Sequence, residues 1–417
     1  MPSDAPHPAD PPSRPLVRRV RIQNFKSIAA CDVTLGPLNV LVGRNGSGKS
    51  NFLEAIDVLR ASLDYSPEQA LQALGGLESV LHRGADSSRG LGIRLGLNLP
   101  DGSEADYGVE LATTSHGLFV RRERLEIHRD TGRTAYFQLE RSPGADTAPA
   151  AAPASFQASR ESMPPSRTDR LYLTTSASFP EFRPVLDSLL ELGFYDPLPS
   201  KMRRLESIIP GHRLYPDAMN IAGVIGLLRA TAPAAMQRVE QYLQTIVPHI
   251  TGVRRVTHDA WETLEFCQER ADAGKPWTFN ALSMSDGTLR ALAILVALQG
   301  RGDRSPRFAG IEEPETALHP AAVGTLLDAL REASSHTQVV LTTHSADLLD
   351  RLDLDQEHLL VAQNTGDAAH ISLADPASLD AIRRHLFGAG ELLRMDQLDV
   401  DRSAATQHVD LFDEAAP

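Results

Sequence analysis

Residues 43–50 read Gly-Arg-Asn-Gly-Ser-Gly-Lys-Ser, and this octapeptide decides the fold. Its glycines, lysine and hydroxyl have the spacing of a phosphate-binding loop. The glycines let successive backbone N–H groups turn inward around the α- and β-phosphates of a nucleotide. In such a loop Lys49 reaches the β/γ oxygens, and the Ser50 hydroxyl helps to coordinate Mg²⁺. The octapeptide therefore predicts a nucleotide-binding site.

The flanking residues support this interpretation. Residues 38–42 are apolar except for Asn39, which is typical of a buried strand, and residues 51–59 have helical apolar spacing. A strand, a glycine loop and a helix in this order aim a helix N-terminus at a phosphate. The residues expected to contact the nucleotide in this loop are Gly43, Arg44, Asn45, Gly46, Ser47, Gly48, Lys49, Ser50 and Asn51.

Composition indicates a soluble globular protein. The chain has 417 residues, 42% of them hydrophobic and 23% charged, enough for one large domain with an insertion or for two lobes. The net charge of −13 argues against a surface that binds nucleic acid everywhere, although a local basic groove stays possible. Cys31 and Cys267 are far apart and predict packed thiols, with no disulfide framework and no paired-cysteine zinc site.

Neither a signal peptide nor a membrane span is expected. The N-terminus is rich in proline, carries Asp4 and Asp10 and lacks an apolar stretch. The longest apolar run, residues 289–298, is too short to cross a bilayer and contains Arg290. We therefore expect a cytoplasmic protein without a membrane partner.

Hydrophobic periodicity predicts an α/β fold in which an antiparallel sheet is added beside the nucleotide core. Residues 17–25 suit a half-buried strand and residues 67–81 a helix. From Leu282 onward short apolar strands alternate with helices, which predicts a parallel sheet. Strand-like alternation occurs at 91–99, 107–112, 118–127 and 134–140, and helical patterns at about 181–193, 218–230 and 234–247.

These patterns divide the chain into six parts. The segment 142–170, rich in alanine, proline and serine, is expected to be a flexible linker. No sustained heptads are visible, so a long coiled-coil arm is not expected. The other expected parts are a disordered tail at 1–15, an N-terminal lobe with the phosphate loop at 16–141, a helical insertion with return strands at 171–280, a C-terminal lobe at 281–395 and an acidic tail at 396–417.

Three segments of the C-terminal lobe fit the chemistry of the loop. Ser285 and Gly287 open a strongly apolar helix, where a hydroxyl and free N–H groups can meet an anion, although an ordinary helix cap needs the same residues. Glu312 and Glu313 end an apolar strand, and they suit Mg²⁺ binding and activation of the attacking water, respectively. His344 follows a buried strand, where it can contact the γ-phosphate or fix the water.

In this order the segments resemble the ATP-binding cassette (ABC) superfamily, specifically its SMC/RecF/OLD-like branch of soluble ATPases. Asn24-Phe25-Lys26-Ser27-Ile28 is similar to that branch's start, and residues 285–287 resemble its signature loop. Residues 312–315 with Leu318-His319-Pro320 resemble its Walker B and D-loop region, and residues 388–393 resemble the end of stand-alone RecF-type ATPases. The resemblance covers about residues 17–140 and 215–395.

The chain departs from the family pattern at several places. Glu312 stands where most cassettes have aspartate. The glutamine that usually couples the nucleotide to the lobe is not evident, and Gln69 and Gln72 are weak candidates. The sequence shows no zinc-hook cysteine motif, and no metal-nuclease domain is recognisable after the ATPase.

The resemblance implies a P-loop ABC-type head that binds ATP and Mg²⁺ and dimerises with two ATPs between two copies. In this scheme Lys49, Glu313 and His344 act in hydrolysis, and Ser50 and Glu312 hold the metal. Ser285 and Gly287 of one copy face the γ-phosphate held by the other copy. The expected role is an ATPase in DNA transactions, namely DNA repair, double-strand break repair or genome defence.

Two other functions stay open. The chain could be an ATP-sensing subunit that gates a separately encoded effector such as a nuclease or toxin, or, with less support, a transporter motor. DNA contact would use basic clusters, which more commonly are solvated strand or helix faces. These clusters are Arg18, Arg19 and Arg21, then Arg121, Arg122 and Arg124, then Lys201, Arg203 and Arg204.

Overall fold

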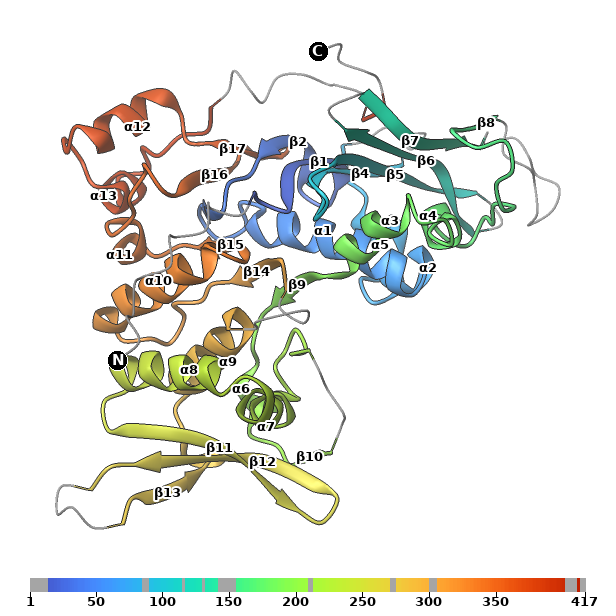
Figure 1. The fold of residues 1–417 in the computed structure, drawn as a ribbon. Coiled ribbons are helices and arrows are strands. Elements are labelled where there is room, and N and C mark those ends of the chain that lie inside the picture. The colour runs from blue at the N-terminus through green and yellow to red at the C-terminus, as the bar shows by residue number, and fades with distance from the viewer. Residues whose placement is uncertain are drawn as a thin grey trace, which may run out of the picture.

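One mixed sheet of thirteen strands organises the fold (Figure 1). The computed structural model describes residues 14–84, 90–114, 117–129, 132–141, 155–208, 213–270, 275–299, 306–401 and 411–412. The strand order is β8-β7-β6-β5-β4-β1-β2-β17-β16-β3-β15-β14-β9. Its strands are β1 (Val17–Phe25), β2 (Ile28–Thr34), β3 (Leu38–Val42), β4 (Leu91–Asn98), β5 (Glu104–Thr114), β6 (Gly117–Arg129), β7 (Gly132–Glu140), β8 (Ser155–Ala158), β9 (Leu192–Tyr195), β14 (Phe308–Glu312), β15 (Gln338–Thr343), β16 (His358–Asn364) and β17 (Ala369–Leu373).

The strands β16, β3, β15, β14 and β9 run parallel and form the nucleotide-binding half of this sheet. Every residue of β3 and β15 is buried, as expected for parallel strands covered on both faces. One face packs against α1 (Lys49–Asp64) and α5 (Arg183–Leu190). The other face packs against α9 (Asp286–Leu298) and α10 (Pro320–Ser334), and α8 (Pro233–Ile246) packs on these two helices. The predicted α/β fold with a mixed core sheet is confirmed.

The strands β1, β2 and β4 to β8 form the antiparallel half, and β4 to β7 match the four predicted strands. Their inner face is apolar, with Leu91, Ile93 and Leu95 of β4 fully buried. β8 corrects one expectation, because residues 155–158 of the presumed linker pair with β7. Residues 142–154 of that linker lie outside the described residues.

The part of the chain between β9 and β14 carries a second, smaller sheet. Its strands are β10 (Glu206–Ser207), β11 (Ile250–His258), β12 (Trp261–Gln268) and β13 (Trp277–Asn280), and α7 (Ile221–Thr231) packs on it (Figure 1). The helix expected at 181–193 is α5, which ends at Leu190. The next residues form β9, a strand that the helical pattern concealed and that pairs with β14.

Short helices complete the described chain: α2 (Pro67–Gln72), α3 (Leu77–Val80), α4 (Tyr172–Ser176), α6 (Pro199–Met202), the 3₁₀ helix η1 (Ala281–Ser283), α11 (Ala346–Leu349), α12 (Pro376–Arg383) and α13 (Ala389–Arg394). The helix expected at 67–81 is divided between α2 and α3, because Gly75 and Gly76 both have positive φ. Across these described elements we find no helix with the length and apolarity that a membrane crossing requires.

The ends of the chain are only partly described. Residues 1–13 of the expected N-terminal tail and residues 402–410 and 413–417 of the acidic tail lie outside the described residues. Within that acidic tail, Val400 bridges Ala374, and Leu411 is buried. Both cysteines are free thiols, and Cys31 is buried as expected whereas Cys267 is half-buried.

A buried carboxylate joins the antiparallel sheet to α4. Glu123 of β6 is 1% exposed and accepts hydrogen bonds from the Tyr107 hydroxyl (2.9 Å) and from the backbone N–H groups of Tyr172 (2.5 Å) and Leu173 (2.8 Å). Burial raises the pKa of Glu123 to about 7, although these three donors and Arg141 oppose the shift. This carboxyl group therefore titrates near neutral pH.

Replacing Glu123 by glutamine should remove a pH-dependent part of the stability. Because the pKa is raised from 4.5 on folding, the protonated carboxyl stabilises the fold fully below pH 4.5, and this stability is lost as the pH rises through about 7. We expect the free energy of unfolding to fall by about 2–3 kcal/mol between about pH 5 and pH 8 in the unmodified protein, and by less in Glu123→Gln. Denaturant unfolding of both proteins at the two pH values measures this, and equal slopes would contradict it.

Candidate nucleotide-binding site

The phosphate loop connects β3 to α1, and its glycines are required by its shape. Gly46 and Gly48 have φ values of 77° and 103°, a left-handed backbone that side chains other than glycine rarely adopt. A Cβ atom at Gly43 would collide with the backbone oxygen of Ala362 on β16, and one at Gly48 would lie 2.8 Å from Cβ of Ala369. The backbone can follow this course only with glycine at these positions.

The loop leaves polar groups available for an anion. Gly48 begins α1 without a side-chain cap, so the first N–H groups of the helix face the loop's interior unscreened by a side chain. The hydroxyl of Ser47 is buried and has no hydrogen-bond partner in the described structure. An orphaned buried hydroxyl beside uncapped N–H groups fits a phosphate.

The Lys49 ammonium group lies within the loop. Its Nζ donates to the backbone oxygens of Gly43 (2.8 Å) and Arg44 (3.2 Å), and the residue is 5% exposed. Burial lowers the pKa of Lys49, while the nearby carboxylates, Glu313 foremost, oppose the shift. The side chain is therefore positioned at the loop by carbonyl groups that a phosphate could replace.

Ser50 and Glu312 meet although 262 positions separate them, because β3 and β14 are parallel strands on either side of β15. The Ser50 hydroxyl donates to Oε2 of Glu312 at 2.7 Å. Burial raises the pKa of Glu312, and this hydrogen bond opposes the shift. Within the described residues no group of three or more His, Cys, Asp or Glu could hold a metal. The pair fits Mg²⁺, which usually takes one or two protein oxygens together with phosphate and water.

Glu313 and His344 also lie in contact. His344 follows β15, and its Nδ1 is 3.2 Å from Oε1 of Glu313. Glu313 itself has a left-handed backbone with φ of 42°, held by a hydrogen bond from its N–H to the Thr342 oxygen at 3.0 Å. A cavity of about 540 Å³ opens beside the two side chains and is also lined by Asp347 and Arg394. The two residues predicted to act on the attacking water thus share one cavity.

A third carboxylate supports this pair, and the sequence analysis missed it. Glu315 is 8% exposed and accepts a hydrogen bond from the Thr343 hydroxyl at 2.5 Å, while its other oxygen has no partner in the described structure. The same hydroxyl accepts from the N–H of Ser345 at 2.9 Å. Burial raises the pKa of Glu315. Because Thr343 and Ser345 flank His344, this chain of hydrogen bonds fixes the histidine's backbone relative to the acidic residues.

Replacing Thr343 by valine should destabilise the fold, because it leaves the buried Glu315 carboxyl without its hydrogen-bond donor. The expected loss in the free energy of unfolding is about 2 kcal/mol. The control Thr343→Ser keeps the hydroxyl and should lose less. Thermal or denaturant unfolding measures both variants, and equal destabilisation by valine and serine would contradict the role of the hydroxyl.

The predicted signature residues lie at the start of α9, apart from the loop. Ser285 is the N-cap of α9, and its hydroxyl accepts from the Thr288 N–H at 3.2 Å. Gly287 packs so closely on the Ala317 oxygen that a Cβ atom would collide with it. No hydrogen bond in the described structure joins Ser285 or Gly287 to residues 43–50. Within one copy, the hydrogen bonds of the described residues therefore do not link the signature residues to the phosphate loop.

Two polar residues to which no role was assigned, Ser27 and Asn364, support the loop. The side-chain amide of Asn51 donates to the Ser27 hydroxyl at 2.7 Å, and that of Asn364 donates to the Gly46 oxygen at 3.2 Å. In the sequence, Ser27 stood out only because it lies in residues 24–28, which resemble the N-terminal segment of the family. Asn364, at the end of β16, left no signal, since its contact crosses 318 positions.

Asp196 is a further unpredicted residue near the acidic pair. Asp196 follows β9, the strand next to β14. Arg290 of α9 bridges the two strand ends, because it donates to the Asp196 carboxylate (3.2 Å) and to the backbone oxygen of Glu312 (3.3 Å). Gln69 and Gln72, the candidates for the coupling glutamine, are exposed on α2. The signal for Asp196 was the short apolar run at 192–195 ahead of an Asp-Pro pair.

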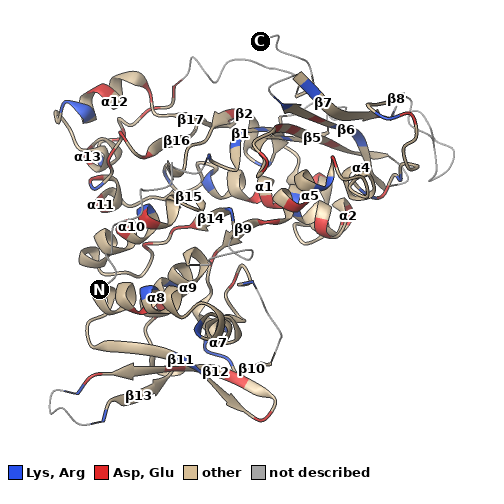
Figure 2. Ribbon diagram, viewed as in Figure 1, with Lys and Arg blue, Asp and Glu red and all other residues tan. Residues whose placement is uncertain are grey.

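Most residues of the basic clusters form ion pairs with carboxylates. Figure 2 colours the basic and acidic residues along the ribbon. Arg19 forms two hydrogen bonds with Asp32, both at 2.6 Å, and Arg121 contacts Glu110 at 2.8 Å. Lys201 pairs with Asp217 at 2.6 Å, and Arg203 with Asp286 at 2.5 Å. These pairs favour the interpretation of the clusters as ordinary polar faces over an open groove for DNA.

The geometry defines a P-loop nucleotide-binding protein with an ABC-type head. Two family models match it: one described as "AAA ATPase domain" at residues 16–106, and one described as "AAA domain, putative AbiEii toxin, Type IV TA system" at residues 248–350. The first contains the phosphate loop, and the second contains Ser285, Glu312, Glu313 and His344.

Curated relatives match shorter parts of the chain. The DNA replication and repair protein RecF of Magnetococcus marinus is 38% identical over 81 residues, 18% of this chain and 21% of the relative. ABC transporter A family member 5 of Arabidopsis thaliana is 38% identical over 74 residues, and the OLD nuclease of Thermus scotoductus is 41% identical over 44 residues. These cover 17% and 11% of this chain and 8% of each relative. The chain thus spans between 8% and 21% of each relative's length.

Solved structures extend the likeness to most of the fold. An SMC head bound to the C-winged helix domain of ScpA has a TM-score of 0.53 at 13% identity, covering 88% of this chain and all of that one. An Smc head from Pyrococcus furiosus has a TM-score of 0.52 at 11% identity, covering 89% of this chain and 99% of that one. Together these findings support the resemblance to the SMC/RecF/OLD-like branch of the ABC ATPases that the sequence motifs predicted.

Proposed function

We propose that this protein is a Mg²⁺-dependent ATPase whose ATP-driven dimerisation is coupled to DNA transactions. The observation that carries the proposal is the hydrogen bond between Ser50 and Glu312, with Glu313 and His344 in contact at the adjacent strand end. It places a phosphate loop, two oxygens suited to a metal and a carboxylate–imidazole pair at one edge of the sheet. The matches to the RecF and OLD relatives support this class of activity.

The residues suggest how the reaction is catalysed. Lys49 exchanges its two carbonyl partners for phosphate oxygens, and the uncapped N–H groups of α1 bind the phosphates. Ser50 and Glu312 would hold Mg²⁺, and the bound ion would neutralise charge on the transferred phosphoryl group. Glu313 orients the attacking water and accepts its proton, and His344 holds the Glu313 carboxylate in place. His344 can also donate to the γ-phosphate when its hydrogen bond to Glu313 is released.

The position of the signature residues supports the proposed dimer. Ser285 and Gly287 begin a helix in the same protein that carries the phosphate loop, yet no hydrogen bond of the described residues joins them to that loop within one copy. A two-fold interface would bring each signature helix to the other copy's loop and complete both sites at once. ATP would then join the two copies, and hydrolysis would release them.

Glu313→Gln should slow hydrolysis while leaving ATP binding intact and prolonging the dimer, because the amide cannot accept the proton of the attacking water. We expect a loss of at least about 100-fold in turnover. Phosphate release, nucleotide binding and gel filtration with saturating ATP measure these effects.

Two variants serve as controls for Glu313→Gln. Lys49→Ala should lose nucleotide binding, and Glu68→Gln, which changes an exposed carboxylate on α2, should behave as the unmodified protein. A Glu313→Gln protein that binds ATP but elutes as a monomer at saturating ATP would disprove the sandwich.

A second function is favoured by Glu312 in place of the usual aspartate, by the carboxylate pairing of the basic clusters and by the match to the model named for a toxin system. In this case the chain senses ATP and gates a separately encoded effector. It would bind ATP and dimerise, but turn over little by itself.

Basal ATP turnover with and without DNA distinguishes the two functions. Coupling to DNA predicts that duplex or single-stranded DNA raises turnover several-fold, and that DNA binding weakens steeply as salt increases, because phosphate contacts release counterions. Low turnover that DNA does not change, with no DNA binding at low salt, would exclude the DNA-coupled function and leave the sensor.

A further inference from the structure

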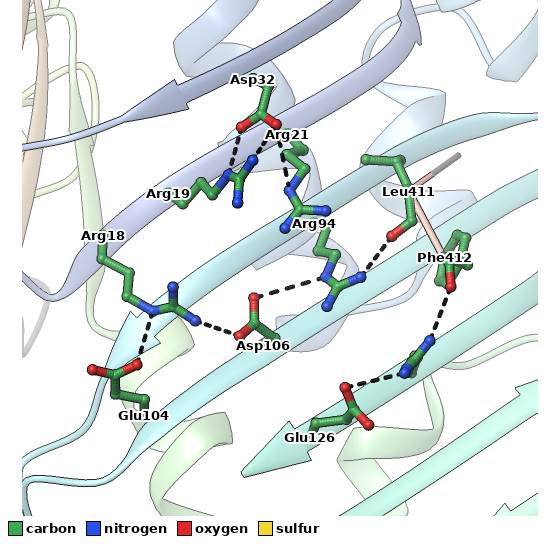
Figure 3. A network of polar contacts seen from close by, with 11 residues as sticks. Arg18, Arg19, Arg21, Asp32, Arg94, Glu104, Asp106, Glu126, Leu411 and Phe412 are labelled. Atoms are coloured by element: carbon green, nitrogen blue, oxygen red, sulfur yellow. Dashed lines mark hydrogen bonds and ion pairs between the residues drawn. The ribbon is translucent and has the colours of Figure 1, made fainter. Parts of the chain in front are cut away.

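The outer face of the antiparallel sheet carries an array of arginines (Figure 3). Strand register places Asp32, Arg21 and Arg94 side by side on β2, β1 and β4, and Arg124 of β6 continues this row beyond Gly108 of β5. The side chains of Arg21, Arg94 and Arg124 are only 10–13% exposed although they lie on the open face of a sheet. Burial lowers the pKa of Arg94, and Arg124 adds to this shift while Asp106 opposes it.

The carboxylates of this face do not use all of the guanidinium groups' donors. Arg94 contacts Asp106 at 3.8 Å, and Arg124 contacts Glu126 at 3.2 Å. Each of the two then donates through Nη1 to a backbone oxygen from the far end of the chain: Arg94 to Leu411 at 2.8 Å and Arg124 to Phe412 at 2.9 Å. Two arginines on separate strands thus hold two consecutive carbonyl groups.

Gly92 leaves space on this face for the side chain of Leu411. Gly92 lies on the outer face of β4, two residues before Arg94, opposite Gln23 of β1 and Glu110 of β5. The Leu411 side chain packs directly on it and is 2% exposed, and a Cβ atom at Gly92 would collide with Leu411 Cδ1. Because Gly92 has no side chain, a space is left on this charged face, and the Leu411 side chain fills it. We call this space at Gly92, together with Arg94, Arg122 and Arg124 around it, the seat.

The next residue is also recognised. The guanidinium carbon of Arg122 lies 5.7 Å from the centre of the Phe412 ring, a cation–π arrangement. The seat therefore contacts both side chains of the Leu-Phe pair and also both of its main-chain oxygens. The sequence around the pair, Asp410, Asp413 and Glu414, is acidic and complements the arginine array in charge.

We propose that the outer face of the antiparallel sheet is a peptide-docking groove, and that its occupant is this chain's own Leu411–Phe412 segment, held reversibly. We call this contact of Leu411 and Phe412 with the sheet of their own chain a strap. Before it in the chain, Asp401 is attached to β17 through its N–H, which bonds to the Leu373 oxygen, whereas Leu411 and Phe412 lie on the antiparallel half. Two residues form a far smaller interface than those of stable complexes, so the contact depends on the tether that keeps the segment at high local concentration. This inference does not rest on the proposed ATPase function.

The test offers the groove a free copy of its occupant. A fluorescein-labelled peptide with the sequence of residues 405–417 is titrated with the full-length protein and with the full-length variant Leu411→Asp, and polarisation is read. In the variant the tethered segment no longer fills the seat, so the peptide should bind at least about ten-fold more tightly than to the unmodified protein. Leu411→Ala replaces the aspartate variant if the latter does not fold.

Matched changes on both sides of the contact identify the seat. A peptide carrying the same Leu411→Asp change should bind neither protein. Adding Gly92→Ala to the Leu411→Asp protein should weaken peptide binding at least about ten-fold, because the new methyl group occupies the leucine's place, while circular dichroism shows the fold unchanged.

Three results would overturn the proposal. The first is a folded Leu411→Asp or Leu411→Ala protein that does not bind the unmodified peptide. The second is equal binding of the peptide by the variant and the unmodified protein. The third is a concentration-dependent dimer of the unmodified protein that Leu411→Asp dissolves, since the groove would then hold the segment of a second copy rather than a strap within one chain.

Discussion

The hydrogen bond between Ser50 and Glu312 is the contact on which the candidate site depends. It spans 262 positions and exists because β3 and β14 run parallel on either side of β15, which brings their carboxyl ends to one edge. The same edge receives His344 from β15 and Asp196 from β9. The buried parallel strands therefore determine where the polar residues gather, and these residues set what the site can do.

Several features of the site were predictable because they are local. The phosphate loop is a contiguous sequence whose glycines are required by positive φ and close packing, so eight residues reveal it without the rest of the chain. The acidic pair and His344 each follow a short apolar run, which predicts a strand end. Their order along the chain, compared with a known family, predicted that Ser50 and Glu312 hold the metal and that Glu313 and His344 act in hydrolysis.

What the sequence concealed depends on contacts between distant residues. β9 lay within a helical pattern because a four-residue strand has too few positions to show its own period. In the sequence, Glu315 is one of several adjacent acidic residues, and nothing local indicates that it is buried. Only the fold shows its carboxylate buried and bonded to the Thr343 hydroxyl. The arginines at 18–21 and 121–124 resembled nucleic-acid contacts because most of their carboxylate partners lie on other strands, away from them in the sequence. The buried position of Leu411 depends on a glycine more than 300 positions away, which no local pattern can indicate.

A structure of the Glu313→Gln protein with ATP and Mg²⁺ would test whether a second copy of the chain completes the site. The measured quantity is the distance from the Ser285 hydroxyl of one copy to the γ-phosphate bound at Lys49 of the other. We predict a hydrogen bond of about 3 Å in both halves of a two-fold dimer. A nucleotide bound at Lys49 with Ser285 of every copy remote from any phosphate would contradict the account.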